Sequence, residues 1–180
     1  HIGRRIVASL DDLIMPSPII VFGATGGVGA ATARILSSHG HPLHLVGRDA
    51  ARTHALAQEL DATSSVGDVL ADGFVRQAVA DAGDDVGGLL YAVGSITLKS
   101  LPRLQREDFL RDYELNVVSA ALAVQAAVPA LKKSGRGSVV LFSSIAASQG
   151  FGMHACIGAA KAAVSGLTLS LAAELAPSIR

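Results

Sequence analysis

The chain has 180 residues, of which 15 are lysine or arginine and 15 are aspartate or glutamate, so its formal net charge is zero. This balance excludes the basic surface of a nucleic-acid-binding protein and any electrostatic attraction to an anionic membrane. Half of the residues are hydrophobic and only 4% are aromatic, which is typical of helices packed closely on a sheet.

The single cysteine, Cys156, excludes an internal disulfide and is typical of a reducing cytoplasm. No apolar run reaches the ~20 residues of a membrane-spanning helix. Residues 1–14 are predicted to be an appended, disordered leader, because Asp11 and Asp12 interrupt the apolar stretch too early for a signal peptide. We therefore expect a cytoplasmic protein with one domain over residues 15–180.

An apolar run over residues 18–22 is followed by glycines spaced G-x-x-x-G-x-G and by a helical stretch to His39. A strand, a glycine turn and a helix in this order indicate dinucleotide binding, because the free N–H groups of the helix attract a pyrophosphate. A turn that is glycine-rich only for packing is the alternative. The predicted cofactor contacts in this turn are Gly23, Thr25, Gly27, Val28 and Gly29.

A second strand is predicted over residues 41–46. His39, His41 and His44 surround it, but a helix end, a turn and a strand point their rings in different directions, so no metal site is predicted. Arg48 follows the strand near the position where many dinucleotide folds carry a carboxylate for the ribose. Its guanidinium favours the 2′-phosphate of NADP(H) over NAD(H), unless it is simply an exposed loop residue. Asp49 is the predicted N-cap of a helix over residues 50–60.

The remaining elements alternate in the same way. Strands are predicted over 62–67, 86–93 and 138–142, and helices over 72–82, 106–133 and 155–175, with Pro129 kinking or ending the second of these helices. This alternation implies right-handed crossovers and a parallel sheet covered on both faces. The sequence therefore predicts an α/β fold, a Rossmann-type doubly wound sheet in three layers with strand order 3-2-1-4-5.

Over residues 18–180 the chain resembles the short-chain dehydrogenase/reductase family. The resemblance is carried by Gly23-x-x-x-Gly27-x-Gly29, Asp68-Val69, Tyr91-Ala92-Val93-Gly94, Asn116, Ser143-Ser144 and Lys161. It implies that Asp68 and Val69 contact the adenine and that Ala92 and Gly94 line the cofactor groove. It also implies catalytic roles for three residues: Ser144 bonds the substrate carbonyl, Lys161 holds the nicotinamide ribose, and Asn116 anchors a water of the proton relay.

The chain departs from the family at its catalytic tyrosine. Four residues before Lys161 stands Ile157, which has no proton to give. A positioned general acid is worth about 10²–10⁴-fold in rate. His154, Tyr91 and Tyr113 are weak candidates to replace it.

The chain also ends where the family continues with two further strands, so we expect the fifth strand to be an unpaired edge. The small-faced helices, together with the resemblance, predict a homodimer or homotetramer. The leading hypothesis is an NADP(H)-linked oxidoreductase acting on a small carbonyl or alcohol. The alternatives are a catalytically silent nucleotide-binding or assembly module and a fragment that binds nothing.

Overall fold

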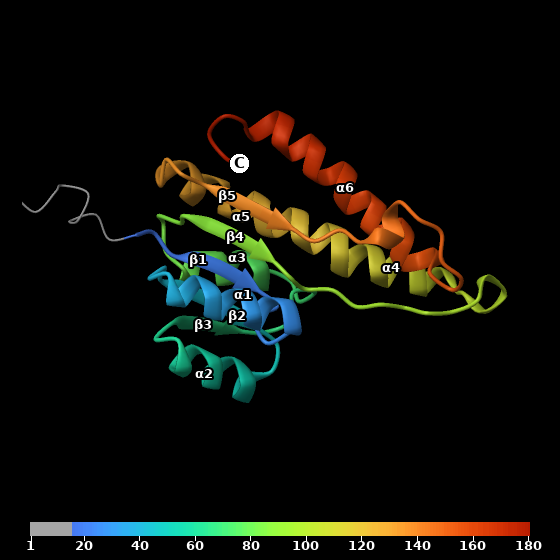
Figure 1. Cartoon of the computed structure of the whole chain (residues 1–180), viewed down its shortest axis with the longest axis horizontal. Helices are drawn as coiled ribbons and strands as arrows, with labels where there is room; N and C mark the ends of the chain where they lie inside the picture. Colours follow the sequence, from blue (N-terminus) through green and yellow to red (C-terminus); the bar gives the residue numbers. More distant parts are fainter. Residues whose placement is uncertain (1–15) are drawn as a thin grey trace, which may run out of the picture.

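The computed structural model describes residues 16–180, so the predicted leader over residues 1–14 lies outside the described residues. Figure 1 shows a five-stranded parallel sheet with the order β3-β2-β1-β4-β5, which confirms the predicted fold class. The strands are β1 (Ile19–Phe22), β2 (Leu43–Gly47), β3 (Thr63–Val66), β4 (Gly88–Tyr91) and β5 (Ser138–Leu141). The helices are α1 (Gly27–Ser38), α2 (Ala50–Glu59), α3 (Phe74–Asp81), α4 (Arg106–Tyr113), α5 (Ser119–Lys133) and α6 (Ala155–Leu175), with short turns η2 (Leu101–Arg103), η3 (Glu114–Val118) and η4 (Ile145–Ala147).

The central strand β1 pairs with β2 on one side and with β4 on the other, so that Ile20 lies opposite both His44 and Leu89. Ile20, Val21 and Phe22 are fully buried. A parallel strand covered on both faces needs such a continuous apolar run, which is why the sequence signal for β1 was strong.

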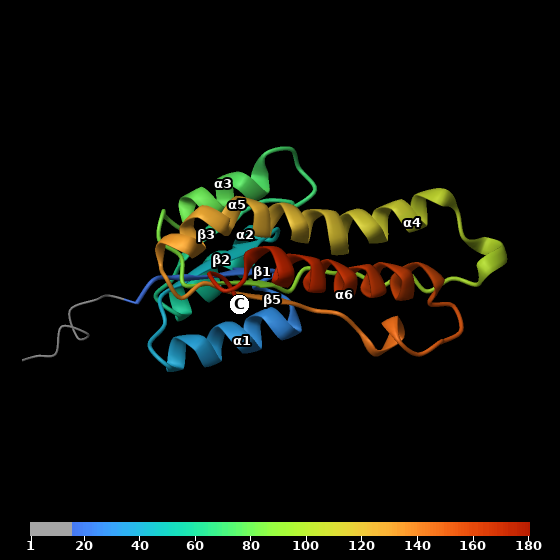
Figure 2. The same ribbon diagram turned by 90° about the horizontal axis from the view of Figure 1, so that it is seen from above.

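Helices cover both faces of the sheet, and Figure 2 shows α1 on one side and α3 and α5 on the other. The face toward α1 and α2 is packed with small and branched residues such as Ala33, Leu45 and Leu56. The opposite face is packed by Phe22 and Tyr91 with residues of α3 and α5. Three layers follow, as the alternation of strands and helices predicted.

The predicted long helix over residues 106–133 is interrupted in a different place from the one expected. It does not end at Pro129, which lies inside α5, because Ala130 and Leu131 beyond it are buried in the core. The irregularity falls at η3, a π-helical turn that joins α4 to α5 and contains Asn116. Such turns are frequent at functional sites because they redirect single side chains.

The prediction that β5 is an unpaired edge is wrong at the start of that strand. The N–H of Val139 donates to the carbonyl of Arg180 at 2.7 Å, and the N–H of Arg180 donates to the carbonyl of Gly137 at 2.9 Å. Ile179 beside this contact is 4% exposed and belongs to the core. Residues far along the chain thus supply the missing partner.

The expectation that no apolar run reaches the ~20 residues of a membrane-spanning helix concerned unbroken runs, and mean hydropathy adds to it. Among residues 16–180, two helical stretches are long and apolar enough on average, by length and composition alone, to cross a membrane: Arg106–Lys133 and Ala155–Leu175. The most apolar part of the first is 50% buried within the structure, as in the core helix of a soluble protein, whereas that of the second is 22% buried. Two such helices are weak evidence for a membrane protein.

Candidate functional site

The glycine turn after β1 is shaped by two close contacts. Gly23 has a φ of +74°, a left-handed conformation that turns the chain sharply off the strand. At Gly29 a Cβ would lie 2.2 Å from the carbonyl oxygen of Gly23, so only glycine lets α1 approach the strand this closely. No heavy atom lies within 4 Å of the Cβ position of Gly27, which leaves its backbone open on the outer side of the turn.

The N-terminus of α1 has no anionic partner of its own. Its N-cap is Gly26, which has no side chain to accept a hydrogen bond, and the first turn contains no acidic residue. Val28 in that turn is 53% exposed. The first N–H groups of α1, together with the helix dipole, are therefore available to a phosphate.

A cleft of about 420 Å³ opens at the carboxyl ends of β1, β2, β3 and β4. In a doubly wound sheet this is the place where the strand order reverses and ligands bind. The predicted site residues that line it are Gly23, Thr25, Arg48, Asp68, Val69, Ala92 and Gly94. Gly27, Val28 and Gly29 lie in the adjoining first turn of α1 rather than in the cleft wall. Asp68 is exposed, and its Oδ1 accepts a hydrogen bond from the N–H of Leu70 at 2.9 Å.

Three arginines, not one, line this cleft: Arg48, Arg52 and Arg111 of α4. Arg48 follows β2 and is exposed, and Arg52 lies in the first turn of α2. The Nη2 of Arg52 donates to the carbonyl oxygen of Thr25 at 2.5 Å, across the cleft mouth. Asp49 caps α2 as predicted, its Oδ1 accepting from the N–H of Arg52 at 3.0 Å. Sequence reasoning missed Arg52, although its spacing of four residues from Arg48 at the start of a helix could have indicated it.

Gly94 lines the cleft and also lies next to two of the predicted catalytic residues, Asn116 and Lys161. A Cβ at this position would lie 2.9 Å from Oδ1 of Asn116 and 3.6 Å from Nζ of Lys161. The Nζ of Lys161 donates to the carbonyl oxygen of Phe142 at 2.9 Å. Burial lowers the pKa of the Lys161 ammonium, and the negative charge of Asp112 opposes that effect. The structure thus brings Asn116 and Lys161 to one point beside Gly94.

The two serines after β5 have different partners. The Oγ of Ser143 donates to the carbonyl oxygen of Lys161 at 2.9 Å and lies 2.8 Å from Oγ of Ser165. It therefore ties the strand end to α6. Ser144 is exposed, and its Oγ accepts from the N–H of Ala146 at 3.1 Å, which leaves its hydroxyl hydrogen available to a ligand.

At the position of the family's tyrosine stands the apolar side chain of Ile157, which is buried and only 4% exposed. Of the three candidates to replace the tyrosine as proton donor, the structure excludes Tyr91. It is buried, its OH lies 2.6 Å from Oγ of Ser119, and burial raises its pKa to about 12. His154 is half-buried at the N-cap of α6, where its Nδ1 lies 2.7 Å from the carbonyl oxygen of Gly152. Tyr113 is 48% exposed on α4.

Two of the three histidines around β2 have partners of their own, and the third, His41, is exposed. His44 is buried, with Nδ1 2.8 Å from Oγ1 of Thr63 and Nε2 2.9 Å from Oγ of Ser65. The Nδ1 of His39 lies 2.7 Å from the carbonyl oxygen of Ile35. Within residues 16–180, no three histidine, cysteine or acidic side chains gather in a way that could hold a metal ion.

Comparison with known proteins agrees with this geometry. A family model described as short chain dehydrogenase matches residues 17–180. Trans-4-hydroxycyclohexanecarboxylate dehydrogenase of Sinomonas cyclohexanicum is 30% identical, over 95% of this chain and 71% of the relative. Carbonyl reductase family member 4 of Danio rerio is 30% identical, over 87% of this chain and 68% of the relative. A solved short-chain type dehydrogenase/reductase from Mycobacterium ulcerans superposes with a TM-score of 0.85 at 25% identity, covering 91% of this chain and 64% of that one.

Proposed function

Because this chain belongs to the short-chain dehydrogenase/reductase family, we propose that it binds NADP(H) and catalyses hydride transfer between this cofactor and a small carbonyl or alcohol. The observation that carries the proposal is the continuity of the site. One cleft leads from the uncapped N-terminus of α1 to Gly94, where Asn116 and Lys161 converge. A cytoplasmic location is part of the same proposal.

The nucleotide end fits a dinucleotide phosphate in charge and in shape. The first N–H groups of α1 would bind the pyrophosphate. They can do so because no side chain caps this terminus and no acidic residue lies in the first turn. Arg48 and Arg52 would bind the 2′-phosphate, because guanidinium groups form short charge-assisted bonds to phosphate oxygens. Asp68 and Val69, at the end of β3, would contact the adenine.

The chemical end would position the substrate. When bound, the nicotinamide supplies or accepts the hydride. Lys161 would hold the nicotinamide ribose with its ammonium, and the exposed hydroxyl of Ser144 would donate a hydrogen bond to the substrate carbonyl. Asn116, whose Oδ1 is buried without a partner among residues 16–180, would accept from a water of the proton relay.

A specific observation favours a second candidate function. Ile157 is buried where the family places its proton donor, so this chain can keep the cofactor site without the chemistry. The second candidate is therefore a catalytically silent nucleotide-binding module.

Isothermal titration calorimetry with NADP(H) and NAD(H) in parallel tests the proposal. Loss of one charge-assisted phosphate contact is worth about 1.5–3 kcal/mol, so Arg48→Ala should weaken NADP(H) binding about 10- to 100-fold and leave NAD(H) unchanged. Arg136→Ala, a charge-matched change at an exposed turn, is the control. Equal losses for both cofactors would show that Arg48 does not touch the 2′-phosphate. Cofactor binding without turnover on a panel of carbonyl compounds would select the silent module, and absence of binding would refute both.

A further inference from the structure

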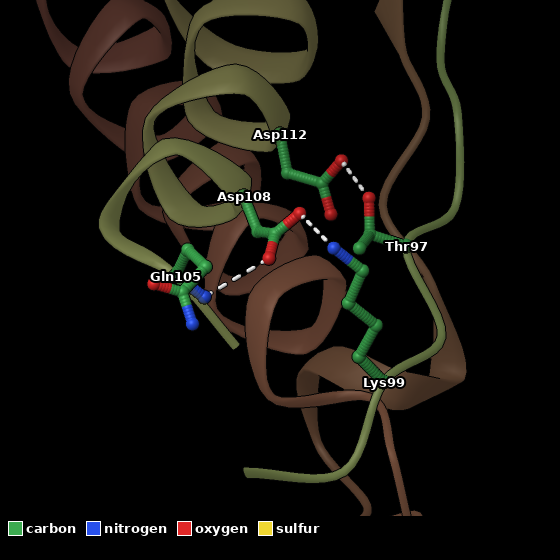
Figure 3. A network of polar contacts seen from close by, with 5 residues as sticks. All are labelled: Thr97, Lys99, Gln105, Asp108 and Asp112. Carbon is green, nitrogen blue, oxygen red and sulfur yellow. Dashed lines mark hydrogen bonds and ion pairs between the residues drawn. The ribbon is translucent and has the colours of Figure 1, made fainter. Parts of the chain in front are cut away.

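Asp112, in the last turn of α4, is an acidic residue with no exposed surface. Its Oδ1 accepts a hydrogen bond from Oγ1 of Thr97 at 3.0 Å, as Figure 3 shows. Its Oδ2 is buried and has no hydrogen-bond partner among residues 16–180. A buried carboxylate oxygen without a donor is costly, so this arrangement needs a compensating charge or donor nearby.

The neighbouring acid on the same helix shows the contrast. Asp108 lies one turn earlier, and its Oδ1 accepts from Nζ of Lys99 at 2.6 Å. Its Oδ2 accepts from the N–H of Gln105 at 3.0 Å, so both oxygens are satisfied. Figure 3 shows the two carboxylates side by side, the first paired with a cation and the second with Thr97 alone.

Asp112 is joined directly to the candidate site through the backbone of η3. The Nδ2 of Asn116 donates to the carbonyl oxygen of Asp112 at 2.8 Å. In residues 16–180, just two buried side-chain oxygen or nitrogen atoms have no hydrogen-bond partner, Oδ2 of Asp112 and Oδ1 of Asn116. They belong to residues four positions apart that this backbone bond joins, and we call these two residues the Asp112–Asn116 cluster.

The donor that matches this cluster is Lys161. Its ammonium has three N–H groups, of which one is used by the carbonyl of Phe142 at 2.9 Å. Its Nζ and the free Oδ1 of Asn116 both approach the Cβ position of Gly94, at 3.6 Å and 2.9 Å, and a water between them would bridge the two groups. Burial lowers the pKa of Lys161, and the charge of Asp112 is the influence that raises it.

We propose that Asp112 is a positioning residue of the candidate site, a buried acid that holds the Lys161 ammonium in place through Asn116 and bridging water. Asp112 does not touch substrate, because it has no exposed surface. Other ionisable groups near Asp112 are Cys156 on α6, Asp108 and Arg111 on α4, and Lys99 in the loop before η2. The effect of the Asp112 charge on cofactor binding rests on the proposed function, whereas the interaction between the charges of Asp112 and Lys161 does not.

The direct test is an NMR titration of the cofactor-free protein labelled with [ε-13C]lysine. The sequence has four lysines, Lys99, Lys132, Lys133 and Lys161, so the Lys161 signal is assigned from the spectrum of Lys161→Met. Asp112→Asn keeps the shape and the bond to Thr97 but removes the charge, and should lower the pKa of Lys161 by about one pH unit. The matched control is Asp108→Asn, which should leave the Lys161 titration unchanged. An unchanged pKa of Lys161 in folded Asp112→Asn overturns the proposal.

A double-mutant cycle of thermal melting temperatures covers the case in which Asp112→Asn is too unstable to titrate. Removing one member of a buried charge pair leaves the other uncompensated, whereas removing both does not. Lys161→Met with Asp112→Asn should therefore melt higher than the sum of the two single losses predicts. Additive losses overturn the proposal.

Calorimetry separates this result from the proposed function. If wild-type protein binds NADP(H), Asp112→Asn should weaken the binding progressively as the pH rises through the lowered pKa of Lys161, while Asp108→Asn should not. If wild-type protein binds no cofactor, the proposed function fails and the NMR result on Asp112 still stands.

Discussion

Replacing Ile157 with tyrosine tests whether the site is a scaffold that lacks one group. Ile157 lies one helical turn before Lys161 on α6 and is 4% exposed, so a phenol there enters a buried position on the same helix face. The Lys161 ammonium would lower the pKa of the phenol, as a nearby cation does. A positioned general acid is worth about 10²–10⁴-fold, but a proton donor alone does not rebuild a substrate pocket, so we expect only a small gain in carbonyl reduction by Ile157→Tyr over wild type.

The larger ring carries a cost that must be measured alongside the rate. Overpacking of a buried position costs about 1–3 kcal/mol. For a chain of this size that corresponds to a melting temperature about 2–12 °C lower. Ile157→Phe has the same ring and the same cost without the hydroxyl, so it is the matched control.

The assay follows NADPH oxidation with a panel of carbonyl compounds at saturating cofactor. If Ile157→Tyr is folded and binds the cofactor as wild type does, yet is no faster than Ile157→Phe, the missing hydroxyl is not what limits the reaction. If wild-type protein already reduces carbonyls and His154→Ala abolishes the activity, the proton donor is His154 and the interpretation of Ile157 as disabling is wrong.

Two further properties can be checked on the unliganded protein. Burial lowers the pKa of His44 in the folded protein. Stability is therefore highest above the unfolded pKa of about 6.5 and falls as the pH drops toward the lowered folded pKa. The loss is about 1.4 kcal/mol for each unit by which folding lowers the pKa. His44→Val should flatten the fall in melting temperature between pH 7.5 and 5.5, whereas the same change at exposed His41 should not, and a retained slope in His44→Val would exclude His44 as its source. Leu122 and Leu169 are 47% and 75% exposed on α5 and α6, so we expect a dimer or tetramer that Leu169→Glu dissociates. Sedimentation of wild-type protein as a monomer at micromolar concentration would contradict this prediction, and Leu98→Glu in the loop after β4 is the control.

The sequence by itself determined the elements whose signals are local. The buried run of β1, the positive φ of Gly23 and the close approach at Gly29 follow from residues within one turn of each other, so the pattern predicted them directly. The cap formed by Asp49 is equally local, since it accepts from an N–H three residues on. Alternating strands and helices then leave few topologies, and the order 3-2-1-4-5 was among them.

Tertiary structure alone decided the contacts between residues distant in sequence. Tyr91 is a candidate acid in sequence, but in the structure its OH is buried and contacts Oγ of Ser119, a residue 28 positions away. Ile179 and Arg180 reach β5 after the whole of α6, which no local pattern indicates. In sequence, an aspartate followed by tyrosine and glutamate in a helix is expected to be exposed to solvent. Asp112 is buried because α4 packs against α6 and against the loop that carries Thr97. Local patterns determine backbone geometry, whereas burial is a property of the assembled layers.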